Sequence, residues 1–143
     1  MPRMFLNGTA MSGQPDHGAI GGAPLVGPVR TAARYRFFAV RDEFPGLLPV
    51  VEGGAEIEGE LYELTDEQLY GSLLPAEPKE LELGTIELAD GQVVNAMQLR
   101  PERLAAGDKV VDISELGGWR AYQRHVAVNE DLAAVFSAEA PRS

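Results

Sequence analysis

The sequence predicts an α+β domain built on a curved or barrel-like mixed sheet with few helices. Strand-like segments follow one another along most of the 143 residues, separated by turns rich in Gly, Pro, Asn and Asp. One capped helix interrupts this run and a second helical segment comes late, unlike the regular alternation of a doubly wound sheet. The length suits one domain, and the absence of cysteine excludes disulfides and thiolate chemistry.

The first element is a short apolar strand that ends in a loop of small and polar residues, Asn7-Gly8-Thr9-Ala10, called the opening loop below. Phe5 and Leu6 indicate a buried strand end. Glycine lets a ligand approach the main chain, and the loop amides together with the Asn7 and Thr9 side chains can hold an anion. The same residue types also make ordinary turns, so a plain turn remains the alternative.

Two strands are expected next, after a Gly-rich segment that predicts only a short turn around residues 17–20. Residues 25–31 predict an edge or bulged strand, because Gly27-Pro28 interrupts the pattern. Residues 33–40 predict a strand from their alternating aromatic side chains. We expect a turn at Phe44-Pro45-Gly46 to close this strand.

The middle of the chain predicts two further strands and then a helix. An apolar run covers residues 47–51, and residues 55–64 alternate acidic with apolar side chains, typical of a strand with one wet face. Thr65 and Gln68 have the spacing of a capping box, so a helix is expected over residues 66–74. Pro75 is expected to stop that helix.

A β-hairpin and two short helical segments complete the domain. The hairpin joins residues 84–88 to 93–99 through Asp90-Gly91, a pair that tolerates the positive φ angles of a tight turn. We expect helical segments at 101–107 and toward the end of 117–125, and one or two helical turns within 129–136. The predicted division is therefore a domain over residues 1–125 and a C-terminal helical tail over 126–143.

The formal net charge of −10 argues against a nucleic-acid or anionic membrane surface, because phosphate groups are held by clustered Lys and Arg. An apolar stretch of transmembrane or signal-peptide length is missing, so a cytoplasmic protein is expected. With two histidines a histidine-rich metal site cannot be built, and we expect no metal and no cofactor. Five arginines precede most of the acidic residues and favour an anionic small molecule there: Arg3, Arg30, Arg34, Arg36 and Arg41.

Several motifs together resemble the C-terminal domain of allophanate hydrolases, in the gamma-glutamylcyclotransferase-like superfamily. The resemblance spans about residues 4–123 and implies a small mixed β-barrel whose first strand ends in an anion-binding loop over a pocket. The 143 residues include no counterpart of the amidase half, so any activity is expected to belong to this domain alone. The motifs are Phe5-Leu6-Asn7-Gly8-Thr9, Gly27-Pro28-Val29-Arg30-Thr31-Ala32 with Tyr35, Pro45-Gly46, Gly59-Glu60-Leu61-Tyr62 and Asp112-Ile113-Ser114-Glu115-Leu116-Gly117-Gly118-Trp119-Arg120-Ala121-Tyr122.

The resemblance implies candidate catalytic residues. The acid–base glutamate of cyclotransferases corresponds to Glu77, and a histidine early in the chain of the allophanate hydrolase relatives corresponds to His17. The cyclotransferase loop Tyr-Gly-Ser-Leu corresponds by position to the opening loop, in which Asn7 replaces the aromatic residue, a departure from gamma-glutamyl specificity. The literal Tyr70-Gly71-Ser72-Leu73 lies in the predicted helix, so we interpret it as coincidence.

Two functions are therefore predicted. The first is a small-molecule enzyme for an anionic amide- or urea-derived substrate, with Glu77 moving a proton, His17 assisting, and the opening loop and Arg36 binding substrate. Its reaction would be of the N-carboxycarbamate decarboxylation type or the gamma-glutamylcyclotransferase type. The alternative is a non-catalytic anion-binding or assembly module that partners a separate amidase. A homodimer or such an amidase is the expected protein partner.

Overall fold

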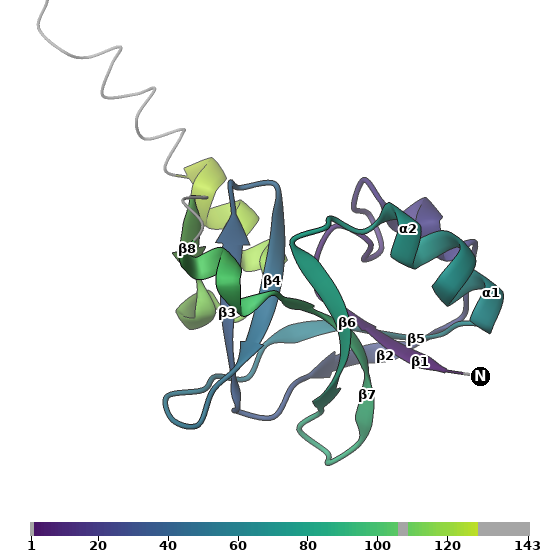
Figure 1. Ribbon diagram of the computed structural model, residues 1–143, viewed down its shortest axis with the longest axis horizontal. Helices are drawn as coiled ribbons and strands as arrows, with labels where there is room; N and C mark the ends of the chain where they lie inside the picture. The colour runs from purple at the N-terminus through teal and green to yellow at the C-terminus, as the bar shows by residue number, and fades with distance from the viewer. Residues whose placement is uncertain (1, 106–108, 129–143) are drawn as a thin grey trace, which may run out of the picture.

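The computed structural model describes residues 2–105 and 109–128 (Figure 1). Within them the α+β prediction is confirmed: the strands form one mixed sheet and the helical segments are short. The strands are β1 (Arg3–Leu6), β2 (Leu25–Arg30), β3 (Tyr35–Val40), β4 (Phe44–Pro49), β5 (Glu58–Glu63), β6 (Leu81–Glu87), β7 (Val93–Leu99) and β8 (Val110–Asp112).

The sheet has the strand order β2-β5-β1-β7-β4-β3-β8, with β6 pairing with β7 outside this path. β1 is antiparallel to β5 and parallel to β7, while β4 is also parallel to β7. The Asp90-Gly91 turn joins β6 to β7 as an antiparallel hairpin, and Gly91 has a φ of +90°. The predicted hairpin and the predicted proximity of β5 to β1 are thus confirmed.

The turn before β4 differs from the prediction. Phe44-Pro45-Gly46 is part of β4, and the chain turns earlier, at Arg41 and Asp42, whose φ angles are +51° and +60°. Two successive left-handed residues give a turn whose twist matches the flanking strands. Neither proline of β4 is a registered partner of β7, where the pair is Leu47 with Gln98, while both pair with residues of β3.

The predicted capping box is confirmed, but the helix does not stop at Pro75. The Gln68 amide donates to Thr65 Oγ1, while Gln68 Oε1 accepts from the Thr65 amide. The helical segment runs through α1 (Asp66–Gln68), a π-helical turn (Leu69–Leu73) and α2 (Leu74–Ala76). The wide π-helical turn, in which the Leu74 amide donates to Leu69 O, changes the usual hydrogen-bond spacing just before the proline.

Two further helical segments lie at the two ends of the sheet (Figure 1). His17–Ile20 form the expected short helical turn, near α1 and α2. Residues 119–128 form a helix on the side of β3, β4 and β8, where the Trp119 and Tyr122 rings stack with centroids 5.4 Å apart. The predicted boundary at 125/126 falls within this helix, and the tail over 129–143 lies outside the described residues.

Candidate functional site

A small cavity lies where β1 ends, and it brings the opening loop and Glu77 together. Its volume is about 20 Å³, which is room for about one water molecule. We call it the opening-loop cavity. It is lined by Phe5, Leu6, Asn7, Gly8, Thr9, Ala10, Phe44, Pro45, Glu77, Leu81 and Met97.

The opening loop presents hydrogen-bond donors that the described residues leave unused. The main-chain N–H groups of Gly8, Thr9 and Ala10 donate to no acceptor in the described part of the chain. The Asn7 side chain is 9 % exposed, and its buried Nδ2 also has no partner there. Because an unpaired buried donor costs free energy, these groups favour an acceptor-rich ligand in the cavity.

Glu77 adds a titratable group to the same cavity. It follows α2 directly, and its amide donates to Leu74 O, which fixes the residue at the end of the helical segment. Burial raises the pKa of the Glu77 carboxyl to about 7, with a further contribution from the negative charge of Asp16. A carboxyl group with this pKa can both donate and accept a proton near neutral pH.

His17 lies behind the opening loop and does not line the cavity. Its Nδ1 is 2.9 Å from Ala10 O, so Nδ1–H donates to that carbonyl group. The imidazole ring also contacts Tyr62, with ring centroids 5.9 Å apart. The structure thus gives His17 contacts that hold the loop, in place of direct contact with a ligand in the cavity.

Arg36 is not brought to the opening-loop cavity. Its Nε donates to Asp112 Oδ2 at 3.0 Å, and its Nη1 donates to Gly53 O at 2.9 Å. These contacts hold the guanidinium on the outer strands β3 and β8, so the structure does not bring Arg36 together with the opening loop and Glu77.

The buried Glu60 carboxylate, whose role the sequence did not reveal, holds Ser12, two residues after the opening loop. Glu60 accepts hydrogen bonds from the Ser12 amide and hydroxyl, both at 2.7 Å, and from Tyr62 OH at 3.0 Å. Burial alone would raise the pKa of Glu60, but these hydrogen bonds and the charge of Arg120 lower it below its ordinary value. Arg120 Nη2 also donates to Ser12 O at 2.6 Å, so β5 and the last helix both hold the loop.

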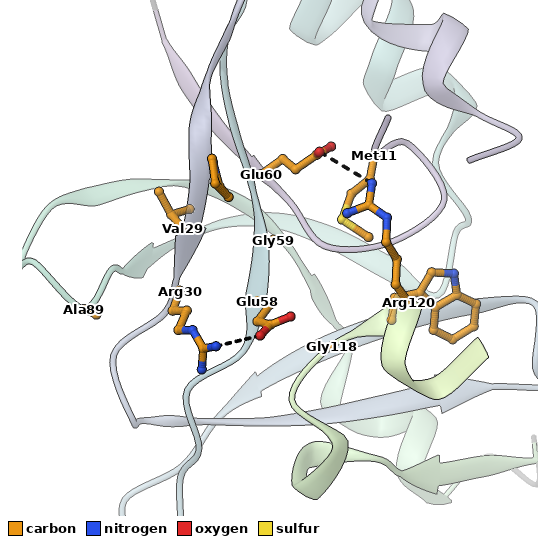
Figure 2. Close-up of a pocket in the computed structure, with 11 residues that line it drawn as sticks. Met11, Val29, Arg30, Glu58, Gly59, Glu60, Ala89, Gly118 and Arg120 are labelled. Carbon is orange, nitrogen blue, oxygen red and sulfur yellow. Dashed lines mark hydrogen bonds and ion pairs between the residues drawn. The ribbon is translucent and has the colours of Figure 1, made fainter. Parts of the chain in front are cut away.

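Sequence reasoning also missed a second, larger cavity of about 620 Å³ over β2 and β5, called the β2–β5 cavity below (Figure 2). The sequence did contain a signal for this cavity. Glu58 and Glu60 are two residues apart on one strand and so share a face, and three motifs of the family resemblance contribute residues to the lining. The lining residues are Met11, Pro28, Val29, Arg30, Glu58, Gly59, Glu60, Ala89, Gly118, Trp119 and Arg120.

The raised pKa of Glu77 predicts a pH-dependent gain in stability for Glu77→Gln. The folded state binds a proton that the unfolded chain releases between pH 4.5 and about 7, so this group stabilises the fold less as pH rises. At pH 8.5 the free energy of unfolding of the variant should therefore be about 3 kcal/mol higher than that of the parent, and at pH 4 the two should agree. Urea denaturation at both pH values checks this, and an equal gain at pH 4 would contradict it.

The part of the chain that the structure describes contains no group of three or more His, Asp or Glu side chains placed to hold a metal ion. Within that same part, each helix is too short or too polar to cross a membrane.

The mixed sheet with its few short helices is a fold of the gamma-glutamylcyclotransferase-like type. A mouse AIG2-like protein shares the fold, with a TM-score of 0.53 and 23 % identity over 73 % of this chain and 82 % of that protein. Residues 2–124 match the family model of the allophanate hydrolase C-terminal domain, and the chain belongs to that family.

Similar proteins include one of about the same length and others that are much longer. The structure of c4763, a uropathogenic Escherichia coli-specific protein, has a TM-score of 0.79 and 34 % identity, and covers 87 % of this chain and 96 % of c4763. Saccharomyces cerevisiae urea amidolyase is 31 % identical over 98 residues, 65 % of this chain and 5 % of that enzyme. Kluyveromyces lactis urea amidolyase shares the fold, with a TM-score of 0.80 and 24 % identity over 87 % of this chain and 8 % of its own.

Proposed function

We propose that this protein is a small-molecule enzyme for an anionic amide- or urea-derived substrate, with the opening-loop cavity as its active site. The observation that carries the proposal is the meeting of Glu77, whose pKa is about 7, with the unpaired donors of the opening loop in one cavity. Perturbed carboxyl groups beside convergent donors are typical of catalytic sites.

In the proposed reaction the substrate carboxylate accepts hydrogen bonds from the opening-loop N–H groups and from Asn7 Nδ2. For an N-carboxycarbamate the C–N bond to one carboxylate breaks, and carbon dioxide leaves while the electron pair stays on nitrogen. Glu77 donates its proton to that nitrogen, which gives a carbamate, and water returns a proton to Glu77. The proton must come from an acid that is neutral near pH 7, and the Glu77 pKa meets this requirement.

The size of the cavity favours this reaction type over gamma-glutamyl cyclisation. A volume of about 20 Å³ requires the walls to open even for a small substrate, and a gamma-glutamyl amine needs more room than an N-carboxycarbamate. The aromatic residue of the cyclotransferase loop is also replaced by Asn7, whose amide offers a donor to a carboxylate in place of an apolar surface.

The second candidate function is a non-catalytic anion-binding or assembly module that partners a separate amidase. This alternative is favoured because the matching region is only a small part of long relatives: it covers 5 % of the yeast urea amidolyase. Such a module would use the same donors without proton transfer, so a test of turnover in a Glu77 variant distinguishes the two functions.

Malonate, which replaces the central N–H of N-carboxycarbamate with CH₂, should bind with uptake of a proton. The dianion is repelled by an ionised Glu77 carboxylate and accepts a hydrogen bond from the neutral acid, so its affinity should fall about tenfold per pH unit above pH 7. Calorimetric titration in two buffers with different ionisation enthalpies measures the proton uptake. The Glu77→Gln variant should bind malonate without proton uptake. Malonate binding by the parent that does not depend on pH between 6.5 and 8.5 would contradict the expectation.

A further inference from the structure

The β2–β5 cavity has the size of a small-molecule site and no part in the proposed reaction. Its volume of about 620 Å³ lies in the usual range for ligand pockets, roughly 300–1,000 Å³. It shares no lining residue with the opening-loop cavity, so a ligand here would occupy a separate site.

Two ion pairs flank the β2–β5 cavity and balance its charge (Figure 2). Arg30 Nη2 is 2.7 Å from Glu58 Oε1 on one side, and Arg120 Nη2 is 3.5 Å from Glu60 Oε2 on the other. With two positive and two negative side chains, the lining has no net charge. A neutral or zwitterionic ligand matches it better than an ion of either sign.

The hydrogen bonds leave both donors and an acceptor free in the cavity lining. Both oxygens of Glu60 are engaged by Ser12, Tyr62 and Arg120. Arg120 uses only Nη2 among the described residues, so its Nε and Nη1 remain donors without a partner there. Glu58 accepts only at Oε1, which leaves Oε2 as an acceptor without a partner in the described structure. Arg30 likewise pairs only through Nη2 in the described structure, so guanidinium N–H donors remain on both arginines and one carboxylate oxygen remains on Glu58.

The rest of the lining is apolar. Met11, Pro28, Val29 and Ala89 contribute hydrophobic surface, and the Trp119 side chain, 3 % exposed, completes it. The lining thus combines apolar surface with free cationic donors and one free anionic acceptor, which suits a molecule with an apolar body and two oppositely charged ends.

We propose that the β2–β5 cavity binds a small zwitterion with an apolar body, such as a free apolar amino acid or dipeptide. The ligand carboxylate pairs with Arg120 Nε and Nη1, its ammonium group pairs with Glu58 Oε2, and its side chain packs against Trp119 and Val29. A chain of net charge −10 repels free anions at long range but exerts no net force on a zwitterion.

The test uses the full chain and L-leucine as the probe. Trp119 is the single tryptophan and lines the cavity, so its fluorescence should change saturably on titration, and calorimetry gives the affinity independently. Leucinamide, which lacks the carboxylate, and N-acetylleucine, which lacks the ammonium group, should each bind about tenfold more weakly or worse. Absence of saturable binding by both methods, or equal binding of the three compounds, would overturn the proposal.

A charge-neutral variant identifies the ammonium contact. Glu58→Gln should weaken L-leucine binding about tenfold and leave the weaker N-acetylleucine binding unchanged, because only the ammonium group pairs with Glu58. Glu56→Gln is the matched control, since Glu56 is exposed two residues earlier and does not line the cavity. Circular dichroism establishes that both variants fold. An equal loss in the two variants, or unchanged leucine binding by Glu58→Gln, would contradict the assignment.

Discussion

Replacement of Glu77 by glutamine is expected to lower kcat at least about 100-fold, the usual minimum contribution of a positioned acid–base group. Glutamine keeps the shape and polarity of the side chain but has no proton to transfer at neutral pH. The substrate carboxylate should still accept hydrogen bonds from the opening loop, so the affinity for malonate at pH 6 should stay within about threefold of the parent. The rate is measured as carbon dioxide release from N-carboxycarbamate generated in the assay.

Glu56→Gln is the control for this loss, because it removes an equal charge from an exposed position outside the cavity. Its rate should equal that of the parent. Undiminished turnover in Glu77→Gln would remove Glu77 from the mechanism. A parent protein that binds malonate and does not accelerate the reaction would support the binding-module alternative.

Gly8→Ala is expected to destabilise the fold by about 2 kcal/mol or more, as overpacking of a buried site does. A Cβ atom at Gly8 would lie 2.6 Å from Pro45 Cδ and 2.7 Å from Pro45 Cγ, and both residues are buried. The proline ring is rigid and part of β4, so the strand itself must move away from the opening loop. The free energy of unfolding from urea titration measures the effect.

This contact changes the interpretation of Gly8. The backbone of Gly8 does not have a positive φ. A glycine is required at this position because Pro45 approaches it closely. Gly18→Ala is the matched control, since a Cβ atom there has no heavy atom within 4 Å and the φ is again not positive. It should leave stability within about 0.5 kcal/mol of the parent. Equal free energies of unfolding for the two variants would contradict the prediction, because they would show that β4 moves away from the added Cβ atom without loss of stability.

Local sequence chemistry predicted the elements that depend on near neighbours. The capping box of Thr65 and Gln68, the Asp90-Gly91 hairpin and the interrupted strand at Gly27-Pro28 each rest on backbone preferences within a few residues. The turn at Arg41 and Asp42 was missed because neither residue is a strong signal for positive φ, while Pro45-Gly46 is a strong turn signal that the strand overrides.

The candidate site depends on contacts between distant segments, and these were predicted only in part. The resemblance placed Glu77 and the opening loop in one pocket, where the structure also has them. Periodicity could not show that Glu60 holds Ser12, or that Asp112 engages Arg36 away from the cavity. Both depend on which strands become neighbours, a property of the whole sheet that no short window of sequence contains.

The strand order also has a consequence for self-association. β2 and β8 end the sheet path, and exposed edge strands are templates for pairing with another chain. β8 has three residues, and β2 is broken by a register shift between Leu25 and Gly27 and by Pro28, which lacks an N–H group. Neither of these two strands offers a long uninterrupted row of main-chain donors and acceptors, so edge-to-edge addition of another chain at β2 or β8 is disfavoured although Leu25 and Val26 are exposed.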